Sequence, residues 1–238
     1  MKIIIYLFFT ISVLICTSGV YGAMPLSDKP IGFGAKAGVV NSIFVPKNGS
    51  SGFSKWQNGM QLGGYFRFHL NEYFSAGAEL LYSQYGTYDL LDTALFYRAN
   101  PLLSQLPVTE KNKRFDVRME CLDIPVILMG KYAFMPDLKS YIYIGANMTI
   151  NIASDVKITR QIDISGQIGE RHFYSDVTER IRRFDYSPVA GAGVTSEMLG
   201  LKLCLDLRYK YGITNINKVE GLPGFTNQAW IITLGIGL

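Results

Sequence analysis

Strict alternation of apolar and polar side chains is the feature that most constrains this chain. It is clearest in residues 201–211, LKLCLDLRYKY. Leucines and tyrosines occupy every odd position there, while Lys202, Asp206, Arg208 and Lys210 occupy even positions. Because successive side chains of a β-strand point to opposite faces, such a strand has one wholly apolar face and one charged face. A helix would instead scatter the charges around its circumference.

The same alternation recurs and predicts eight strands. They span residues 31–44, 60–70, 73–86, 121–132, 140–153, 184–197, 201–211 and 228–238. Short connections (71–72, 135–139, 198–200) alternate with long ones (45–59, 87–120, 154–183, 212–227). Short turns at one end and long loops at the other are typical of barrels in bacterial outer membranes. We therefore predict an all-β fold: an eight-stranded antiparallel up-and-down transmembrane β-barrel.

The composition agrees with membrane strands. Hydrophobic residues make up 48% of the 238 residues and charged residues only 18%. After the N-terminal segment, however, no apolar run reaches the roughly 18 residues of a spanning helix. The formal net charge of +4 is too small to indicate a nucleic-acid partner. A secreted lipocalin-like ligand-binding barrel, also eight-stranded, stays open as an alternative, because alternation alone does not say which face is inside.

The N-terminus predicts export. Lys2 precedes an apolar run over residues 3–16, and small residues lead to a cleavage site before Ala23. We expect residues 1–22 to be a cleaved signal peptide and residues 23–238 to be the mature barrel domain in the cell outer membrane. An uncleaved membrane anchor is the alternative.

The charged side chains of the predicted strands all lie on the less apolar parity. They form a predicted interior polar network of Lys36, Arg67, Glu79, Asp123, Lys131, Asp185, Glu197, Lys202, Asp206, Arg208 and Lys210. An eight-stranded barrel is only just wide enough for its side chains, and buried charges are tolerated when they are paired. We therefore expect a structural polar plug that closes the barrel. A narrow small-solute channel is the alternative.

Three further residues carry local predictions. Pro125 lies inside a predicted strand and cannot donate to the ladder, so we expect a β-bulge there. Cys121 and Cys204 fall toward opposite ends of the barrel, much further apart than the roughly 7 Å limit for a disulfide. Both are expected to be free, inert thiols.

Residues for catalysis or cofactor binding are scarce. The sequence has two histidines, His69 at the short-turn end of a strand and His172 in a long loop. Neither has a readable nucleophile–base spacing, they are too few for a dedicated transition-metal site, and no Walker or dinucleotide motif is present. We expect no enzymatic activity, no cofactor and no metal.

Function is therefore expected to come from the loops and from partners. Outer-membrane lipid and lipopolysaccharide are expected partners, because loop arginines can contact lipopolysaccharide phosphates; these are Arg171, Arg180, Arg182 and Arg183. We expect a monomeric barrel with a structural role.

Two segments carry a resemblance to a known family. Residues 121–128, CLDIPVIL, followed by Lys131 and Tyr132, and residues 206–216, DLRYKYGITNI, resemble signatures of the PorT-like outer-membrane barrels of Bacteroidota. The resemblance covers most of residues 31–238. It implies an outer-membrane barrel with an accessory role in protein secretion, the type IX pathway in particular, together with other secretion-machinery proteins as partners.

Overall fold

The computed structural model describes residues 31–47, 54–71, 73–88, 113–135, 138–164, 167–198, 200–219 and 224–237. Its strands are β1 (Ile31–Pro46), β2 (Lys55–His69), β3 (Phe74–Tyr88), β4 (Lys113–Met135), β5 (Leu138–Ile164), β6 (Gln167–Asp176), β7 (Phe184–Met198), β8 (Leu201–Tyr211) and β9 (Phe225–Gly237), with one 3-10 turn, η1 (Thr178–Arg180). The predicted signal peptide lies outside the described residues. Within those residues, no helix is long and apolar enough to cross a membrane.

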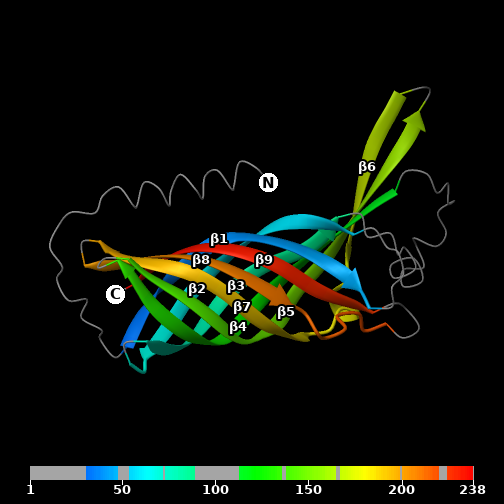
Figure 1. The fold of residues 1–238 in the computed structure, drawn as a ribbon. Helices are drawn as coiled ribbons and strands as arrows, with labels where there is room; N and C mark the ends of the chain where they lie inside the picture. The colour runs from blue at the N-terminus through cyan, green and yellow to red at the C-terminus, as the bar shows by residue number, and fades with distance from the viewer. Residues whose placement is uncertain are drawn as a thin grey trace.

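Eight strands close into an antiparallel barrel, as predicted. The ring runs β1–β2–β3–β4–β5–β7–β8–β9, and β9 pairs with β1 again, so that the first and last strands lie side by side (Figure 1). The tight connections β2–β3, β4–β5 and β7–β8 share one end with the start of β1 and the end of β9; we call this the turn end. The opposite end, which carries the longer connections, is the loop end.

Two strands leave the ring at the loop end and form a projection (Figure 1). Residues 113–120 of β4, residues 154–164 of β5 and all of β6 make up this antiparallel sheet, which we call the extension. The prediction of plain connections over 87–120 and 154–183 is therefore wrong where these strands lie. Residues 87 and 88 of the first connection belong to β3, and residues 89–112 lie outside the described residues.

A β-bulge explains why the alternation did not reveal the extension. The β4–β5 register shifts between Cys121↔Asn151 and Glu120↔Ala153, so that Ile152 is the extra residue. Asn151 and Ser154 are both buried while Ile152 is 55% exposed. The inward positions thus change from odd to even numbers, and a strict two-residue pattern ends at this point although the strand continues.

The bulge predicted at Pro125 is wrong. Pro125 pairs with Asn147 of β5 in an unbroken register. On the β3 side, the pairs Ala78↔Val126 and Leu81↔Asp123 keep the same register across the proline. The missing donor therefore interrupts the pairing without an inserted residue.

The outside of the barrel is apolar. Ile142, Ile144 and Leu234 are 70%, 68% and 67% exposed. Exposed aromatic residues lie toward both ends: Phe33, Phe68, Phe74 and Tyr132 at the turn end, and Tyr186, Tyr211 and Trp230 at the loop end. A soluble barrel would hide such side chains, whereas a band of apolar residues between aromatic girdles is the surface of a membrane barrel. The lipocalin-like alternative is excluded.

Candidate functional site

Charged side chains from three strands meet inside the barrel in what we call the Glu79 layer: Lys36, Glu79, Asp206 and Arg208. Glu79 Oε1 lies 2.8 Å from Lys36 Nζ, and its Oε2 lies 2.7 Å from Arg208 Nη2. Lys36 Nζ is also 3.4 Å from Asp206 Oδ2. Closure of β1 against both β2 and β9 brings β3 and β8 within reach of Lys36. Two cations face two carboxylates, so the formal charges of the layer cancel.

Two tyrosines of β5 complete this layer. The Tyr143 hydroxyl donates to Asp206 Oδ1 at 2.6 Å and accepts from Arg208 Nε at 2.9 Å, while the Tyr141 hydroxyl donates to Asp206 Oδ2 at 3.2 Å. On the β5–β7 ladder, Tyr143 pairs with Gly191 and Tyr141 pairs with Gly193. A Cβ at either glycine would collide with the facing ring. These glycines therefore make the room in which the tyrosines saturate a buried carboxylate.

A second cluster, the Asp123 layer, lies nearer the loop end. Lys210 Nζ is 3.7 Å from Asp123 Oδ1 and 3.6 Å from Asp185 Oδ2. The same ammonium donates to Thr149 Oγ1 at 2.7 Å and lies 4.2 Å from the centre of the Tyr85 ring. Tyr85 in turn donates its hydroxyl proton to Asp123 Oδ2. One cation faces two carboxylates here, which leaves a formal charge of one negative unit.

Both layers are buried. The side chains of Lys36, Glu79 and Lys210 are each 1% exposed, and that of Arg208 is 4% exposed. A buried charge is stable only when it is paired and its remaining donors or acceptors are satisfied. The Glu79 layer meets this condition, whereas Asp185 in the Asp123 layer has an ion-pair contact to Lys210 but no hydrogen-bond partner for its oxygens.

Residues 23–218 match the outer membrane protein beta-barrel domain family. The chain belongs to this family. Membership assigns the barrel to the outer membrane, with its turn end toward the periplasm and its loop end outside. The PorT-like resemblance is a finer assignment and stays a prediction.

Several solved outer-membrane barrels are similar to this chain. They include Ail of Yersinia pestis in complex with the heparin analogue sucrose octasulfate (13% identity, TM-score 0.41, 88% of this chain and 100% of Ail). Neisserial surface protein A has 12% identity and a TM-score of 0.43, and the match covers 87% of this chain and 96% of that protein. OprG from Pseudomonas aeruginosa has 10% identity and a TM-score of 0.43, and the match covers 88% of this chain and 95% of OprG. Among curated proteins, none matches the sequence.

The predicted interior residues lie at different depths of this outer-membrane barrel domain. Those buried in the two layers are Lys36, Glu79, Asp123, Asp185, Asp206, Arg208 and Lys210. Arg67, Lys131 and Lys202 are half-buried at the turn end. Glu197 is exposed beside the last residue of β7, so its assignment to the buried network is wrong. Alternation predicts whether a side chain points into the barrel or out of it. It does not predict whether an inward side chain lies deep in the interior or at the open end, where water reaches it.

The loop half of the interior holds an apolar cluster among buried polar side chains such as Gln57, Asn151 and Asn227, and the alternation of charges did not predict this cluster. The buried cluster there comprises Val40, Phe44, Tyr85, Val117, Met119, Cys121, Val156, Ile158, Val177, Ile216, Phe225, Ala229 and Ile231. Val40 and Ile231 occupy the inward parity of their predicted strands, so the alternation predicts their burial, whereas Met119 lies in a segment that was predicted as a connection.

The remaining candidate residues lie apart from one another. His69 Nδ1 is 2.8 Å from Ser75 Oγ and 2.9 Å from Lys131 Nζ at the turn end. His172 is exposed on β6, with Nδ1 3.1 Å from Thr159 Oγ1. In the part of the chain that the structure describes, no group of three or more His, Cys, Asp or Glu could hold a metal ion. The expectations of no enzymatic activity and no cofactor stay predictions.

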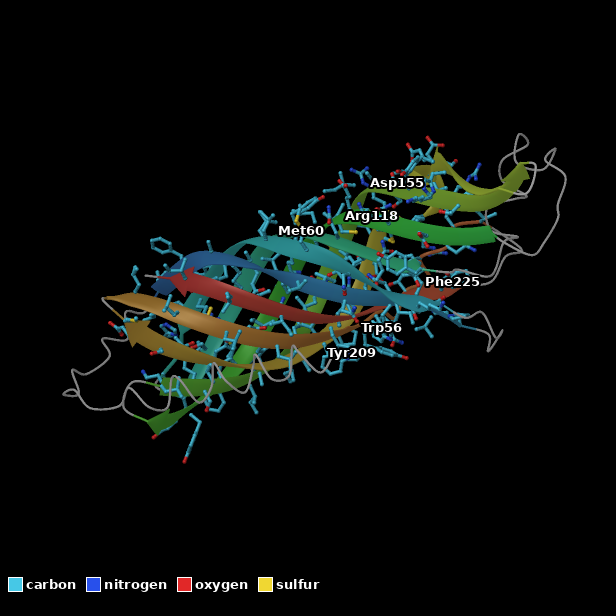
Figure 2. All side chains as sticks on the ribbon, turned by 90° about the horizontal axis from the view of Figure 1, so that it is seen from above. Trp56, Met60, Arg118, Asp155, Tyr209 and Phe225 are labelled. Carbon is cyan, nitrogen blue, oxygen red and sulfur yellow. The ribbon has the colours of Figure 1, made fainter. Side chains whose placement is uncertain are left out.

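Two features face outward at the loop end. In the extension, cross-strand pairs bring opposite charges together, Asp116 with Lys157 and Arg118 with Asp155; the latter pair is labelled in Figure 2. Below it, Asp176 Oδ1 accepts a hydrogen bond from the Thr178 backbone N–H at 2.8 Å. Hydrogen bonds from the side chain and backbone of Thr178 hold the pKa of the Asp176 carboxyl below its usual value.

Proposed function

We propose that the protein is a closed, non-conducting outer-membrane barrel with a structural or secretion-accessory role, acting through the parts that project beyond the membrane. The observation that carries this proposal is the pair of buried, ion-paired layers across the interior. A solute or ion would have to separate these pairs in order to pass.

The energy of such a separation argues against a small-solute channel. Breaking a buried pair by removing one partner costs about 3–5 kcal/mol. In the Glu79 layer, a passing ion would disturb Lys36, Glu79 and Arg208 together, because Glu79 bridges both cations.

The extension offers a surface for partners. Its β5–β6 hairpin pairs ten residues of each strand, from Asp155↔Asp176 to Ile164↔Gln167. At about 3.3 Å per residue, this hairpin reaches about 30 Å past the bulge. A projecting sheet that carries charged side chains such as Arg118, Asp155 and Lys157 is suited to contacts with another protein or with the polysaccharide outside the cell.

Protein secretion is the second candidate and rests on the PorT-like resemblance. The residues that carry it include Asp123, Asp206, Arg208 and Lys210, which the barrel uses for its two interior layers. The resemblance therefore supports a barrel interior similar to that of the PorT-like barrels. A shared secretion role follows from it only by analogy.

Lipopolysaccharide is the lipid partner that the outer wall favours. A groove at the loop end is lined by the exposed basic residues Arg182, Arg183 and Lys218 and by the exposed rings of Phe184 and Tyr186. Cations above an apolar, lipid-facing wall match a phosphorylated glycolipid of the outer leaflet. Arg180 is half-buried beside them, and the side chain of Arg171 lies outside the described residues.

Planar-bilayer recording tests the closed barrel. The refolded protein is expected to give no stable conductance steps, while a variant with Lys36, Glu79 and Arg208 all changed to Ser should give them if it folds. Stable steps from the unaltered protein would overturn the proposal. Heat-dependent migration on gels establishes that each sample is a folded barrel.

A deletion strain tests the role outside the membrane. Complementation with a variant in which residues 155–176 are replaced by a short turn is expected to leave the barrel folded and the partner-dependent phenotype unrestored. Measuring secreted proteins in the culture medium separates the two roles. Normal secretion in the deletion strain would remove the secretion-accessory role and leave the structural one.

A further inference from the structure

The turn end of the interior carries an excess of positive charge. A recess of about 50 Å³ there is lined by Arg67, His69, Met129, Lys131, Lys139, Ser140, Tyr141, Thr195 and Lys202. Among the described residues, this lining contains several basic side chains and no carboxylate. The Glu79 layer above it is already neutral, so it has no spare negative charge to offer.

Arg67 is the basic side chain of this recess with unpartnered buried donors. Its Nε and Nη2 atoms are buried and have no hydrogen-bond partner in the described structure. The guanidinium carbon lies 4.7 Å from the centre of the Tyr65 ring and 5.2 Å from that of Tyr141. The two rings hold the planar group in place but cannot accept both of its free N–H groups in its plane. Leaving buried donors of a charged group unsatisfied is costly.

The rest of the recess has the chemistry of an anion site. Lys202 lies opposite Glu197 on the β7–β8 ladder, yet the two side chains form no ion pair within 4 Å, and Glu197 is exposed. Lys131 lies 2.9 Å from His69 on the neighbouring wall. A planar guanidinium fork with free N–H groups suits the paired oxygens of a phosphate or carboxylate, while lysines add point charge.

We propose that this recess binds one small oxyanion from the periplasm, with Arg67 as its forked donor and Lys202 as a supporting cation. The basic lining of this small recess suits a small anion such as phosphate. Because the recess opens inside the barrel wall, a free oxyanion is favoured over the phosphate of a lipid headgroup. The proposal goes beyond the partner role and does not depend on it.

Phosphate itself is the probe. The full chain is refolded in an uncharged detergent in chloride buffer and titrated with inorganic phosphate, with binding followed by calorimetry and by the thermal unfolding midpoint. We expect saturable binding and a rising midpoint. Arg67→Gln should weaken binding by about tenfold or more, because it removes the charge-assisted hydrogen bonds. The matched control Lys218→Gln removes a basic residue at the opposite end and should leave the affinity unchanged.

Several outcomes would overturn the proposal: no saturable phosphate binding, equal binding by Arg67→Gln, or complete displacement of phosphate by modest chloride. If Arg67→Gln does not fold, Lys202→Gln decides, since this half-buried rim residue should lower the affinity severalfold and an unchanged affinity would refute the site. Vesicles containing phosphatidylglycerol identify the source of the oxyanion. Competition with phosphate that is lost in Lys202→Gln would mean a headgroup, and its absence would mean the free anion.

Discussion

Tyr143 and Gly191 face each other across the β5–β7 ladder, and the tyrosine ring fills the space that a Cβ on residue 191 would need. The same Cβ would meet the Leu207 carbonyl oxygen at 2.5 Å, so the backbone of β8 would also have to shift. Gly191→Ala is therefore expected to lower the free energy of unfolding by about 1–3 kcal/mol. Urea titration of the refolded barrel, read by gel migration without heating, measures the loss.

Gly64 supplies the matched control for this substitution. A Cβ there would meet only the Gly34 carbonyl oxygen, at an ordinary 3.5 Å. Gly64→Ala should therefore change stability by no more than about 0.5 kcal/mol. Equal losses in both variants would show that lost glycine flexibility, and not the tyrosine ring, is responsible.

Removing one charge from the Glu79 layer is expected to be severe. Glu79→Gln leaves the ammonium of Lys36 and the guanidinium of Arg208 buried without their shared carboxylate. The expected cost is about 3–5 kcal/mol, measured by urea unfolding in lipid vesicles. Glu197→Gln changes the same functional group at an exposed position and should shift stability by less than about 0.5 kcal/mol. A mild effect at Glu79 would contradict the buried pairing.

The lipid-facing wall is open to a depth test. Ile144 lies in the middle of the barrel portion of β5, and Tyr132 lies at the turn end of β4; both side chains point outward and are 68% and 69% exposed. Ile144→Arg should cost about 2–4 kcal/mol in a bilayer, and Tyr132→Arg about 0–1 kcal/mol. Equal costs at both depths would argue against this placement in the membrane.

The two cysteines should be unreactive in the folded barrel. Cys121 and Cys204 are free and only 0% and 3% exposed. A maleimide reagent is expected to label neither residue in the folded protein and both after unfolding in urea, because burial blocks access. Mass spectrometry counts the added groups. Unfolded protein that labels only after reduction would instead indicate a disulfide.

The sequence predicted the barrel because a two-residue period survives wherever one face meets lipid and the other meets the interior. That constraint acts on Leu201 and Leu203 as strongly as on Ile142 and Ile144. It weakens past the membrane, where both faces of a sheet can be polar. The bulge at Ile152 then inverted the pattern, so the continuation of β5 and the whole of β6 were predicted as loop.

The interior network was predictable as a set but not as pairs. Parity placed Lys36, Glu79 and Asp206 inside, yet Lys36 and Asp206 are 170 positions apart in the sequence. Which side chains share a height depends on the stagger between neighbouring strands, and the sequence pattern does not encode that stagger. Glu197 was assigned to the interior for the same reason: the sequence pattern does not give the position of a side chain along the barrel axis.

The length of β5 has a mechanical consequence. This single strand of 27 residues belongs to the wall of the barrel and continues through the extension. It pairs with β4 from Lys113↔Arg160 to Met135↔Leu138. Because antiparallel hydrogen bonds run perpendicular to the strands, a pull along the extension loads this ladder in shear. Its bonds then resist together instead of opening one after another like a zipper. A partner that drags on the extension would therefore pull on the whole barrel, which acts as an anchor under tension.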